Sequence, residues 1–462
     1  MKTYDQFIGL ETTYPLADGT NRQRIHLDGA ASPLIMQSAR EARDALAPHY
    51  SNSHSHAHAS AHISAKAMSW SHETILKVCG AQAKDYSLVT LGNGSTAVIN
   101  NIARRLRARQ NEKPIVLVSE MEHHANDLPH RQQGHEVIHF PLVGESSCAG
   151  EVDLEALETI LEQYAGRVNY VTVSGVSNVT GIVNPITEIT TLAHKHDALC
   201  LLDAAQMTAH MALNISELNV DFVAFSGHKV YCASSPGILI AKTELLRMFP
   251  SDEVGGGVIS HVSYQDAEYL DDYPAREQAG TKNSLGIYSL GAVMQELSDI
   301  GLSSVQKHSE ELWQYAYQRL SKIDEITVYG RSNHPRIGAL SFNLTEIDHG
   351  LLASILSDYF SIAVRNECFC AHPYVSSMIK EALWDLDLAD IPDGQQEAYI
   401  NRKRGMVRAS FSLYNTKNDI DKLVEALKKI ITNINDYEKH YDVFDDGSYR
   451  HRAFNIQWQD YI

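Results

Sequence analysis

The chain has 462 residues, of which 44% are hydrophobic and 8% aromatic, and its formal net charge is -18. This content is enough for a large buried core, and the acidic balance argues against nucleic acid as a main partner, because phosphate binding needs a basic patch. No run approaches the roughly 18 apolar residues of a membrane span. Residues 1–19 lack a basic segment followed by an apolar core, so we expect no membrane partner, no secretory signal and a cytoplasmic location.

The six cysteines are sparse and mostly isolated along the chain. A disulfide framework is not expected in so long a chain without an export signal. We therefore expect a reducing compartment, in which any of these thiols is free to react.

The N-terminal segment, residues 1–65, is expected to pack with a small C-terminal domain or to bridge to it. It contains the run His54-Ser55-His56-Ala57-His58-Ala59-Ser60-Ala61-His62. Alternating histidines in an extended loop could bind a metal, but no carboxylate or cysteine ligand lies nearby. We expect no metal here, and we expect one or two of these histidines, His54 first, to reach a substrate site.

From about residue 85 to 245, short apolar runs alternate with helical patterns. The predicted strands are 87–91, 114–119, 168–174, 198–203 and 221–225, and the predicted helices are 96–107, 153–164 and 186–196. Such alternation predicts an α/β fold with a mostly parallel sheet covered on both faces, and we assign residues 66–285 to this large domain. Ligands of such sheets bind beyond the carboxyl ends of the strands.

Beyond residue 285 the pattern changes to a smaller α+β domain, residues 286–435. Helices are predicted over 284–300 and 309–322, and strands over 339–344 and 407–411. The last helix is predicted to begin at Thr416, which can cap it with Asp419 three residues on. The acidic, aromatic tail, residues 436–462, is expected to form an ordered arm over the body or to contact a partner subunit.

Lys229 and Asp203 carry the strongest chemical signal. Lys229 follows the apolar run 222–225 in Ser226-Gly227-His228-Lys229, and Asp203 ends another run in Asp203-Ala204-Ala205-Gln206. A lysine amine can condense with the aldehyde of pyridoxal phosphate, and an aspartate can keep the pyridine nitrogen protonated, so that the ring accepts electrons. The pair therefore predicts a pyridoxal phosphate site.

Polar residues after other predicted strands fit the same cofactor. Ser95 and Thr96, after two glycines and at a helix start, offer donors to a phosphate, although Gly-Ser-Thr is also ordinary capping. His123 can stack on a ring and move protons, and Asn178 can bond the cofactor's 3-oxygen or a substrate carboxylate, although a turn residue is the simpler reading. Gln206 is expected at the ring oxygen.

Two further motifs lie in the second half of the chain. Cys368-Phe369-Cys370 could ligate zinc, but no second pair follows at usable spacing; buried thiols or a nucleophilic thiolate are the remaining readings. Arg408 opens a predicted strand and could clamp an α-carboxylate in a two-pronged pair, or lie on the surface.

Together these residues resemble the class V aminotransferase-like family of pyridoxal phosphate enzymes, and within it the cysteine desulfurases, over about residues 25–435. The motifs are Ile25-His26-Leu27-Asp28-Gly29-Ala30-Ala31, Gly94-Ser95-Thr96, Glu122-His123-His124-Ala125-Asn126, Asp203-x-x-Gln206, Ser226-Gly227-His228-Lys229, Ala279-Gly280-Thr281 and residues 365–373. Cys-Phe-Cys, a long insertion before Arg408 and residues 390–394 are similar to the desulfurase domain of molybdenum cofactor sulfurases.

The resemblance implies a fold-type I homodimer. It implies that Ser226 and His228 contact the cofactor, and that Gly280 and Thr281 reach the phosphate of the partner subunit. It also gives the persulfide-carrying role to Cys370 and catalytic roles to Lys229 and His123.

We therefore expect an enzyme that removes sulfur from cysteine, or from an analogue, and leaves alanine, with a possible sulfur-acceptor protein as a partner. Two alternatives stay open. One is a C–S or C–Se β-lyase or epimerase of the same family, which needs no nucleophilic thiol. The other is a sulfur-relay or scaffold subunit with little turnover.

Overall fold

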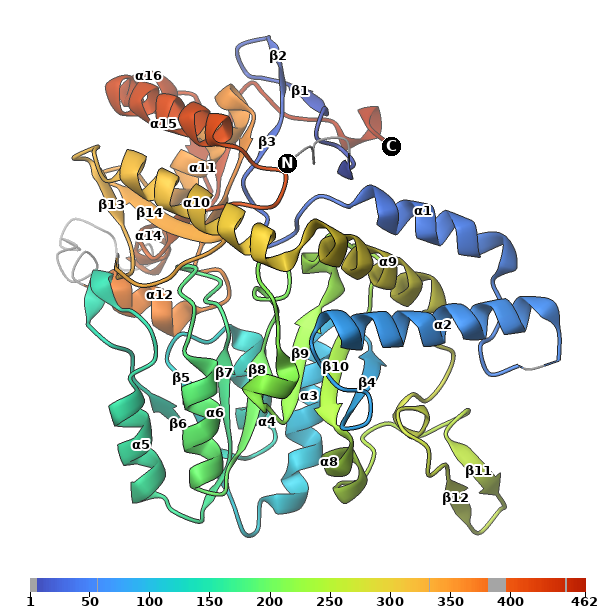
Figure 1. Ribbon diagram of the computed structural model, residues 1–462. Helices are drawn as coiled ribbons and strands as arrows, with labels where there is room; N and C mark the ends of the chain where they lie inside the picture. Colours follow the sequence, from blue (N-terminus) through green and yellow to red (C-terminus); the bar gives the residue numbers. More distant parts are fainter. Residues whose placement is uncertain (1–5, 56, 332, 381–395, 445–446) are drawn as a thin grey trace.

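The computed structural model describes residues 6–55, 57–331, 333–380, 396–444 and 447–462. His56 and the 390–394 stretch, which the sequence analysis used, lie outside the described residues. The chain folds into a large sheet with helices on both faces and a smaller sheet packed at one end of it (Figure 1).

A seven-stranded sheet forms the large part, in the order β4-β10-β9-β8-β7-β5-β6. Its strands are β4 (Tyr86–Leu91), β5 (Ile115–Ser119), β6 (Glu136–Phe140), β7 (Val168–Ser174), β8 (Leu199–Asp203), β9 (Phe222–Ser226) and β10 (Gly237–Lys242). Only β10 among these runs antiparallel to its neighbours, β4 and β9. The predicted mostly parallel sheet is confirmed.

Alternate residues of these strands enter two different cores. On β5, Ile115 and Leu117 belong to one buried cluster, and Val116 and Val118 belong to another. Side chains alternate across a strand, so a strand that is covered on both faces must be apolar at every position. This explains the unbroken apolar runs in the sequence.

Helices supply the outer side of each core. Helix α3 contributes Val98, Ile99 and Ile102 to the second cluster, and helices on the other face contribute to the first. These helices are α3 (Gly94–Leu106), α4 (Leu128–Gln132), α5 (Leu154–Gln163), α6 (Ile186–Lys195), α7 (Ile215–Leu218) and α8 (Thr243–Met248).

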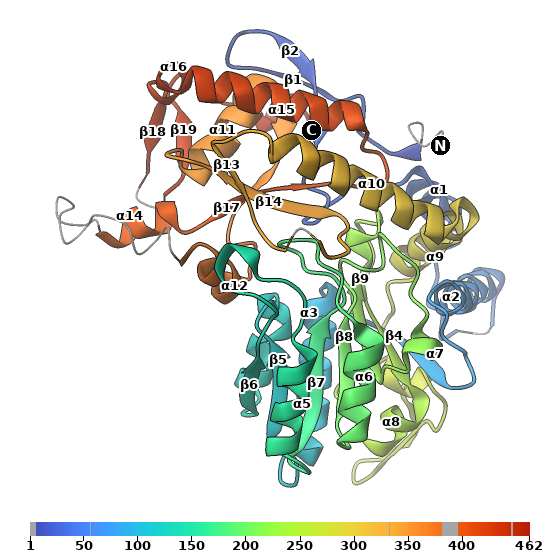
Figure 2. The ribbon, with the colours of Figure 1, turned by 60° about the vertical axis from the view of Figure 1, so that its left-hand side comes forward.

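The smaller sheet is antiparallel, in the order β13-β14-β17-β16, and a third core cluster lies between it and its helices. The elements of this part are β13 (Ile326–Val328), β14 (Ala339–Leu344), β16 (Arg365–Glu367), β17 (Met406–Ser410), α10 (Leu302–Leu320), α11 (His349–Phe360), α14 (Gln396–Lys403), α15 (Lys417–Thr432) and α16 (Ile434–Glu438). Helix α12 (His372–Met378) lies between β16 and α14 in the chain, but its buried residues belong to the first core cluster, that of the large sheet. Figure 2 shows α10, α11 and α15 above this sheet. Thr416 and Asp419 form the predicted capping box of α15.

The N-terminal segment touches both parts of the molecule. Strand β3 (Ile25–His26) pairs in parallel with β15 (Ile362–Ala363), and Asp28 bridges to Ser410. Leu27 is buried in the small core, while Met36 is buried in the large one. The four-part division predicted from the sequence stays a prediction.

Three long helices lie along one flank of the large sheet: α1 (Gln37–Leu46), α2 (Ala59–Val78) and α9 (Ser284–Ile300) (Figure 1). Three two-stranded hairpins complete the described structure. They are β1 (Thr13–Pro15) with β2 (Asn21–Gln23), β11 (Ile259–Val262) with β12 (Ala267–Tyr269), and β18 (Tyr441–Val443) with β19 (Tyr449–His451). The last hairpin belongs to the tail and packs on α11, where Tyr441 donates to Asp358 at 3.0 Å.

None of the helices in the described ranges has both the length and the apolarity needed to cross a membrane.

Candidate active site

Lys229 and Asp203 stand at the ends of neighbouring parallel strands. Strand β9 runs into a single helical turn, Gly227–Lys229, and β8 ends on Asp203, beside Ala224 of β9. Burial lowers the pKa of Lys229 and raises the pKa of Asp203, and each residue's charge partly opposes the shift of the other. A lysine with a lowered pKa holds more of the unprotonated amine that reacts with aldehydes.

Most of the predicted cofactor residues line one cavity of about 230 Å³. Those that line it are Ser95, Thr96, His123, Asn178, Asp203, Gln206, Ser226, His228 and Lys229. The sequence analysis gave no site role to Asn93, Ser174, Val176 and Ala205, which also line it. Ser174 is the last residue of an apolar strand, and this signal could have identified it.

At the edge of this cavity, the start of α3 lies in close contact with the end of β9. Ser95 donates its backbone N–H to Ser226 Oγ at 2.6 Å, at the start of the helix. Gly94 has φ +62°, and a Cβ added there would lie 2.5 Å from Ser226 Oγ. The glycine is therefore required both by its backbone conformation and by the close approach of β9.

His123 enters the cavity from the segment after β5. Burial, with the charge of Lys229, lowers the pKa of His123 to about 3. Its Nδ1 accepts the backbone N–H of Ala125 at 3.0 Å, so the proton of the neutral ring is assigned to Nε2. A neutral imidazole with a free Nε2–H can stack on a ring and donate into the cavity.

Glu122, next to His123, is a buried carboxyl that the sequence analysis did not single out. It accepts hydrogen bonds from Ser119 Oγ, from Asn126 Nδ2 at 2.6 Å, and from Ser174 through N at 2.8 Å and Oγ at 2.6 Å. Burial raises its pKa to about 7 despite these donors. The network fastens the His123 segment to the end of β7.

Asn178 and Arg408 form one buried unit beside the cavity. Arg408 donates to the Asn178 carbonyl at 2.8 Å, and it forms an ion pair with Asp28 at 3.3 Å. Its Nε is buried without a hydrogen-bond partner among the described residues. A buried guanidinium with an unmatched N–H suits an anionic ligand.

Gln206 lines the cavity with its amide engaged elsewhere. Its Nε2 donates to the Ala30 carbonyl at 2.7 Å. The predicted contact with the cofactor's ring oxygen stays a prediction.

The two neighbouring thiols of the Cys-Phe-Cys motif differ sharply. Cys368 is buried, and burial raises its pKa to about 11; its Sγ contacts the Arg404 carbonyl at 3.2 Å. Cys370 is exposed and lines an outer pocket of about 670 Å³. Thr96 and His123 line both this pocket and the inner cavity, so the exposed thiol lies next to the cofactor site.

Gly280, Thr281 and His54 are not among the residues that line the inner cavity. His54 Nε2 instead lies 3.3 Å from the Gly280 carbonyl. The chain's own fold thus brings these three residues to one another and not to Lys229.

The extended loop predicted for the whole histidine run is wrong in its second half. Helix α2 begins at Ala59, and His58 caps it by accepting the Ala61 N–H at 3.3 Å. Alanine favours helix strongly, and this preference outweighed the alternating pattern. Within the described residues, one group with metal-ligand spacing occurs, Glu158, Glu162 and His196, and it lies apart from this run.

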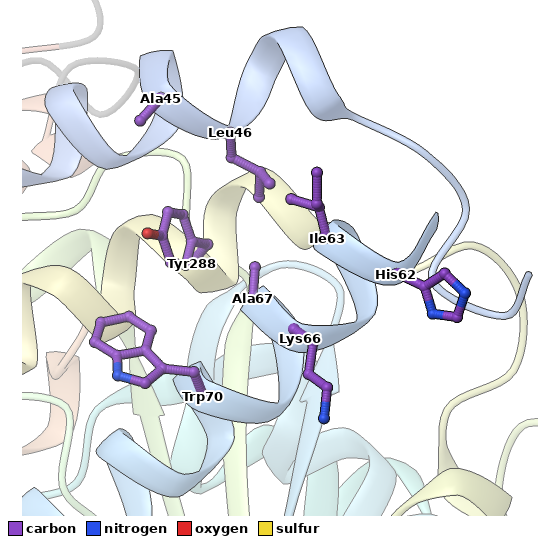
Figure 3. A pocket seen from close by; sticks show the side chains of 8 residues that line it. All are labelled: Ala45, Leu46, His62, Ile63, Lys66, Ala67, Trp70 and Tyr288. Carbon is purple, nitrogen blue, oxygen red and sulfur yellow. The ribbon is translucent and has the colours of Figure 1, made fainter. Parts of the chain in front are cut away.

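A shallow apolar pocket of about 560 Å³ opens on the α1, α2 and α9 flank (Figure 3). Its side chains include Ile63 and Trp70, which are 40% and 38% exposed. Exposed apolar side chains that gather on one face mark surfaces that other molecules cover.

The inner cavity fits pyridoxal phosphate by the chemistry of its donors. It offers a buried amine with a lowered pKa, a buried carboxyl, a neutral imidazole, and the hydroxyls of Ser95, Thr96 and Ser226 near the start of α3. Each suits a different part of that cofactor: aldehyde, ring nitrogen, ring face and phosphate.

Known proteins resemble this chain over nearly its whole length. The aminotransferase class-V profile matches residues 25–423. A probable cysteine desulfurase of Halalkalibacterium halodurans is 33% identical over 411 residues, which cover 88% of this chain and 92% of that protein. A cysteine desulfurase of Escherichia coli is 32% identical over 416 residues, 88% of this chain and 93% of the relative.

Solved structures agree with the fold. An apo cysteine desulfurase from Thermococcus onnurineus superposes with a TM-score of 0.76 at 25% identity, covering 89% of this chain and 95% of that one. The Escherichia coli cysteine desulfurase CsdA, in its S-sulfonic acid form, superposes with a TM-score of 0.74 at 26% identity, covering 93% and 98%.

Proposed function

Because the chain belongs to the class-V aminotransferase family and to the cysteine desulfurases within it, a family of pyridoxal phosphate enzymes, we propose that it removes sulfur from L-cysteine and leaves alanine. One observation carries this proposal. An exposed thiol, Cys370, lines a pocket that shares Thr96 and His123 with the inner cavity, where Lys229 and Asp203 stand at adjacent strand ends.

Lys229 has two tasks in the proposal. Its Nζ would hold the aldehyde of the cofactor, and as a free amine it would take the proton from the substrate Cα. Both tasks need an unprotonated amine, which the lowered pKa of Lys229 supports. Bound pyridoxal phosphate would supply the electron sink for this deprotonation, and Asp203 would pair with its ring nitrogen.

Arg408 and Asn178 orient the substrate. The buried guanidinium, with its unmatched Nε–H, binds the α-carboxylate, and the Asn178 carbonyl holds that guanidinium by accepting a hydrogen bond from it. This fixes the amino acid so that its sulfur points towards Cys370. His54, the third predicted substrate residue, contacts the Gly280 carbonyl. It therefore lies with Gly280 and Thr281, away from the inner cavity of its own chain.

Cys370 then receives the sulfur. Its thiolate attacks the substrate sulfur, an S–S bond forms as the C–S bond breaks, and the electrons of the broken bond return to the carbon skeleton. Protonation of that carbon completes alanine. His123, with its proton on Nε2, is the proposed donor, and Cys370 is left as a persulfide.

The working assembly is proposed to be a homodimer. Gly280 and Thr281 lie away from the chain's own cavity, which supports their predicted place at a partner's phosphate. The apolar pocket of Figure 3 supports an interface in which the partner subunit covers the α1, α2 and α9 flank. We also propose a cytoplasmic location, consistent with six unpaired cysteines, and a sulfur-acceptor protein that takes the persulfide sulfur.

A product assay tests the proposal. The purified protein, loaded with pyridoxal phosphate, is given L-cysteine and a reductant. Sulfide and alanine in equal amounts are expected. Pyruvate and ammonia would instead indicate β-elimination, and absence of any product would indicate a relay subunit.

A further inference from the structure

Phe369, between the two cysteines, has contacts on both sides that the proposed mechanism does not use. Its side chain is 6% exposed, and its carbonyl accepts a hydrogen bond from Asn178 Nδ2 at 2.9 Å. Phe369 and Cys370 have φ of +52° and +55°, values that non-glycine residues seldom adopt. Such a backbone persists where surrounding contacts hold it in place, often at functional sites.

The ring of Phe369 covers one face of the Arg408 guanidinium. Arg408 Cζ lies 4.7 Å from the ring centroid. Two N–H groups of Arg408 donate hydrogen bonds to Asn178 and to Asp28. The Nε–H has no hydrogen-bond partner among the described residues. The ring therefore contacts the guanidinium, and the Nε–H is left for a carboxylate.

The next residue, Cys370, is hydrogen-bonded to His124 of the outer pocket. The backbone N–H of His124 donates to the Cys370 carbonyl at 2.7 Å, and the backbone N–H of His372 donates to His124 Nε2 at 3.2 Å. Helix α12, which follows the loop, lies at the end of the large sheet that faces the small one (Figure 2). The thiol-bearing loop is thus fixed at two adjacent residues, by Arg408 and Asn178 on one side and by His124 on the other.

We propose that Phe369 is a positioning residue that couples carboxylate binding at Arg408 to the presentation of the Cys370 thiol. This inference rests on the proposed function, because it takes Arg408 as the carboxylate site. A carboxylate at the edge of Arg408 draws the guanidinium towards itself, and the ring and the Asn178 bond pass that shift to the loop. An occupied site and an empty site then present Cys370 differently.

The test compares Phe369→Leu, which keeps the apolar volume but removes the aromatic face, with Phe369→Tyr, which keeps the face. Phe360→Leu is the matched control, since Phe360 is a half-buried phenylalanine of α11 outside both pockets. The first measurement is the rate at which iodoacetamide alkylates Cys370 in the holoenzyme, with and without saturating L-alanine, read by peptide mass spectrometry. The second is the separate KM and kcat for L-cysteine.

In the wild type, L-alanine should change the alkylation rate at least about fivefold. In Phe369→Leu this ratio should fall to near one, and KM should rise about tenfold, the size expected for the loss of a desolvated cation–π contact, with a smaller change in kcat. Phe369→Tyr and Phe360→Leu should retain the wild-type ratio.

The proposal is overturned if L-alanine leaves the wild-type rate unchanged, or if Phe369→Leu keeps the wild-type ratio. Equal loss in Phe369→Leu and Phe369→Tyr also overturns it, since the aromatic face would then not matter. Alkylation needs no turnover, so a failed desulfurase assay and a failed coupling test are distinguishable results.

Discussion

The inner cavity and the outer pocket differ in size, lining and chemistry although they share Thr96 and His123. The inner cavity, about 230 Å³, is lined largely by residues at the ends of sheet strands and holds Lys229 and Asp203, whose pKa values are shifted by burial. The outer pocket, about 670 Å³, is lined by helix residues of α3 and α4 and by the exposed Cys370. Under the proposed function, proton removal from the substrate Cα thus belongs to the inner cavity, and attack on the substrate sulfur belongs to the exposed thiol of the outer pocket.

The largest effect is expected from Lys229→Ala, which empties the inner cavity of its amine. Sulfide release should fall by more than about a thousandfold, because both the covalent link and the base are lost. Borohydride reduction of the holoenzyme, followed by mass spectrometry, should give no cofactor adduct. Lys84→Ala, at a surface lysine, should keep both the adduct and the activity.

Cys370→Ala should impair the chemistry proposed for the outer pocket and leave the inner cavity intact. Sulfide release is expected to fall by roughly a hundredfold or more, since no nucleophile remains to take the sulfur, while the cofactor absorbance stays that of the wild type. Cys148→Ala removes the other exposed cysteine and should leave the rate unchanged. Full activity in Cys370→Ala would remove the persulfide step.

Arg408→Lys tests whether Arg408 orients the substrate between the inner cavity and the outer pocket. The lysine keeps the charge but loses the planar donor fork, so KM for L-cysteine should rise by roughly thirtyfold. The fall in kcat should be smaller. An unchanged KM in steady-state assays would place the carboxylate elsewhere.

Glu122→Gln is expected to change stability more than rate. Burial raises the pKa of Glu122 from 4.5 to about 7, so between these values the unfolded chain ionises while the folded carboxyl stays protonated. The free energy of unfolding should therefore contain a contribution that is full below pH 4.5 and is lost as the pH rises to 7, on the order of 3 kcal/mol.

The variant removes this titration, so its unfolding free energy should vary less between pH 4.5 and 7 in urea titrations. Glu120→Gln, at an exposed neighbour, should keep the wild-type slope. Parallel curves for Glu122→Gln and the wild type would show that this carboxyl does not titrate as expected.

Much of the fold could be predicted because its signals are local. The apolar runs of β5, β7, β8 and β9 and the Thr416 capping box needed no knowledge of distant partners, and the structure has them. Helix α10 begins at Leu302, earlier than the predicted residue 309, because Gly301, with φ +91°, both ends α9 and starts the next helix.

The parts of the site that sequence reasoning missed are long-range. Asp28 meets Arg408 across 380 positions, and Asn178 meets Phe369 across 191, and no periodicity encodes such pairs. The antiparallel direction of β10 is likewise set by its neighbours and not by its own residues. The predicted site roles of Lys229, Cys370 and Arg408 await the experiments above.

The pairing of β3 with β15, and of Ala30 with Ser410 across 380 positions, has a consequence for biosynthesis. Strand β3, whose Ile25 is buried in the small core, is translated long before β15 and Ser410. Contacts between such distant residues slow folding. We expect the nascent chain to acquire the large sheet during translation, while its leading segment stays available to chaperones until release.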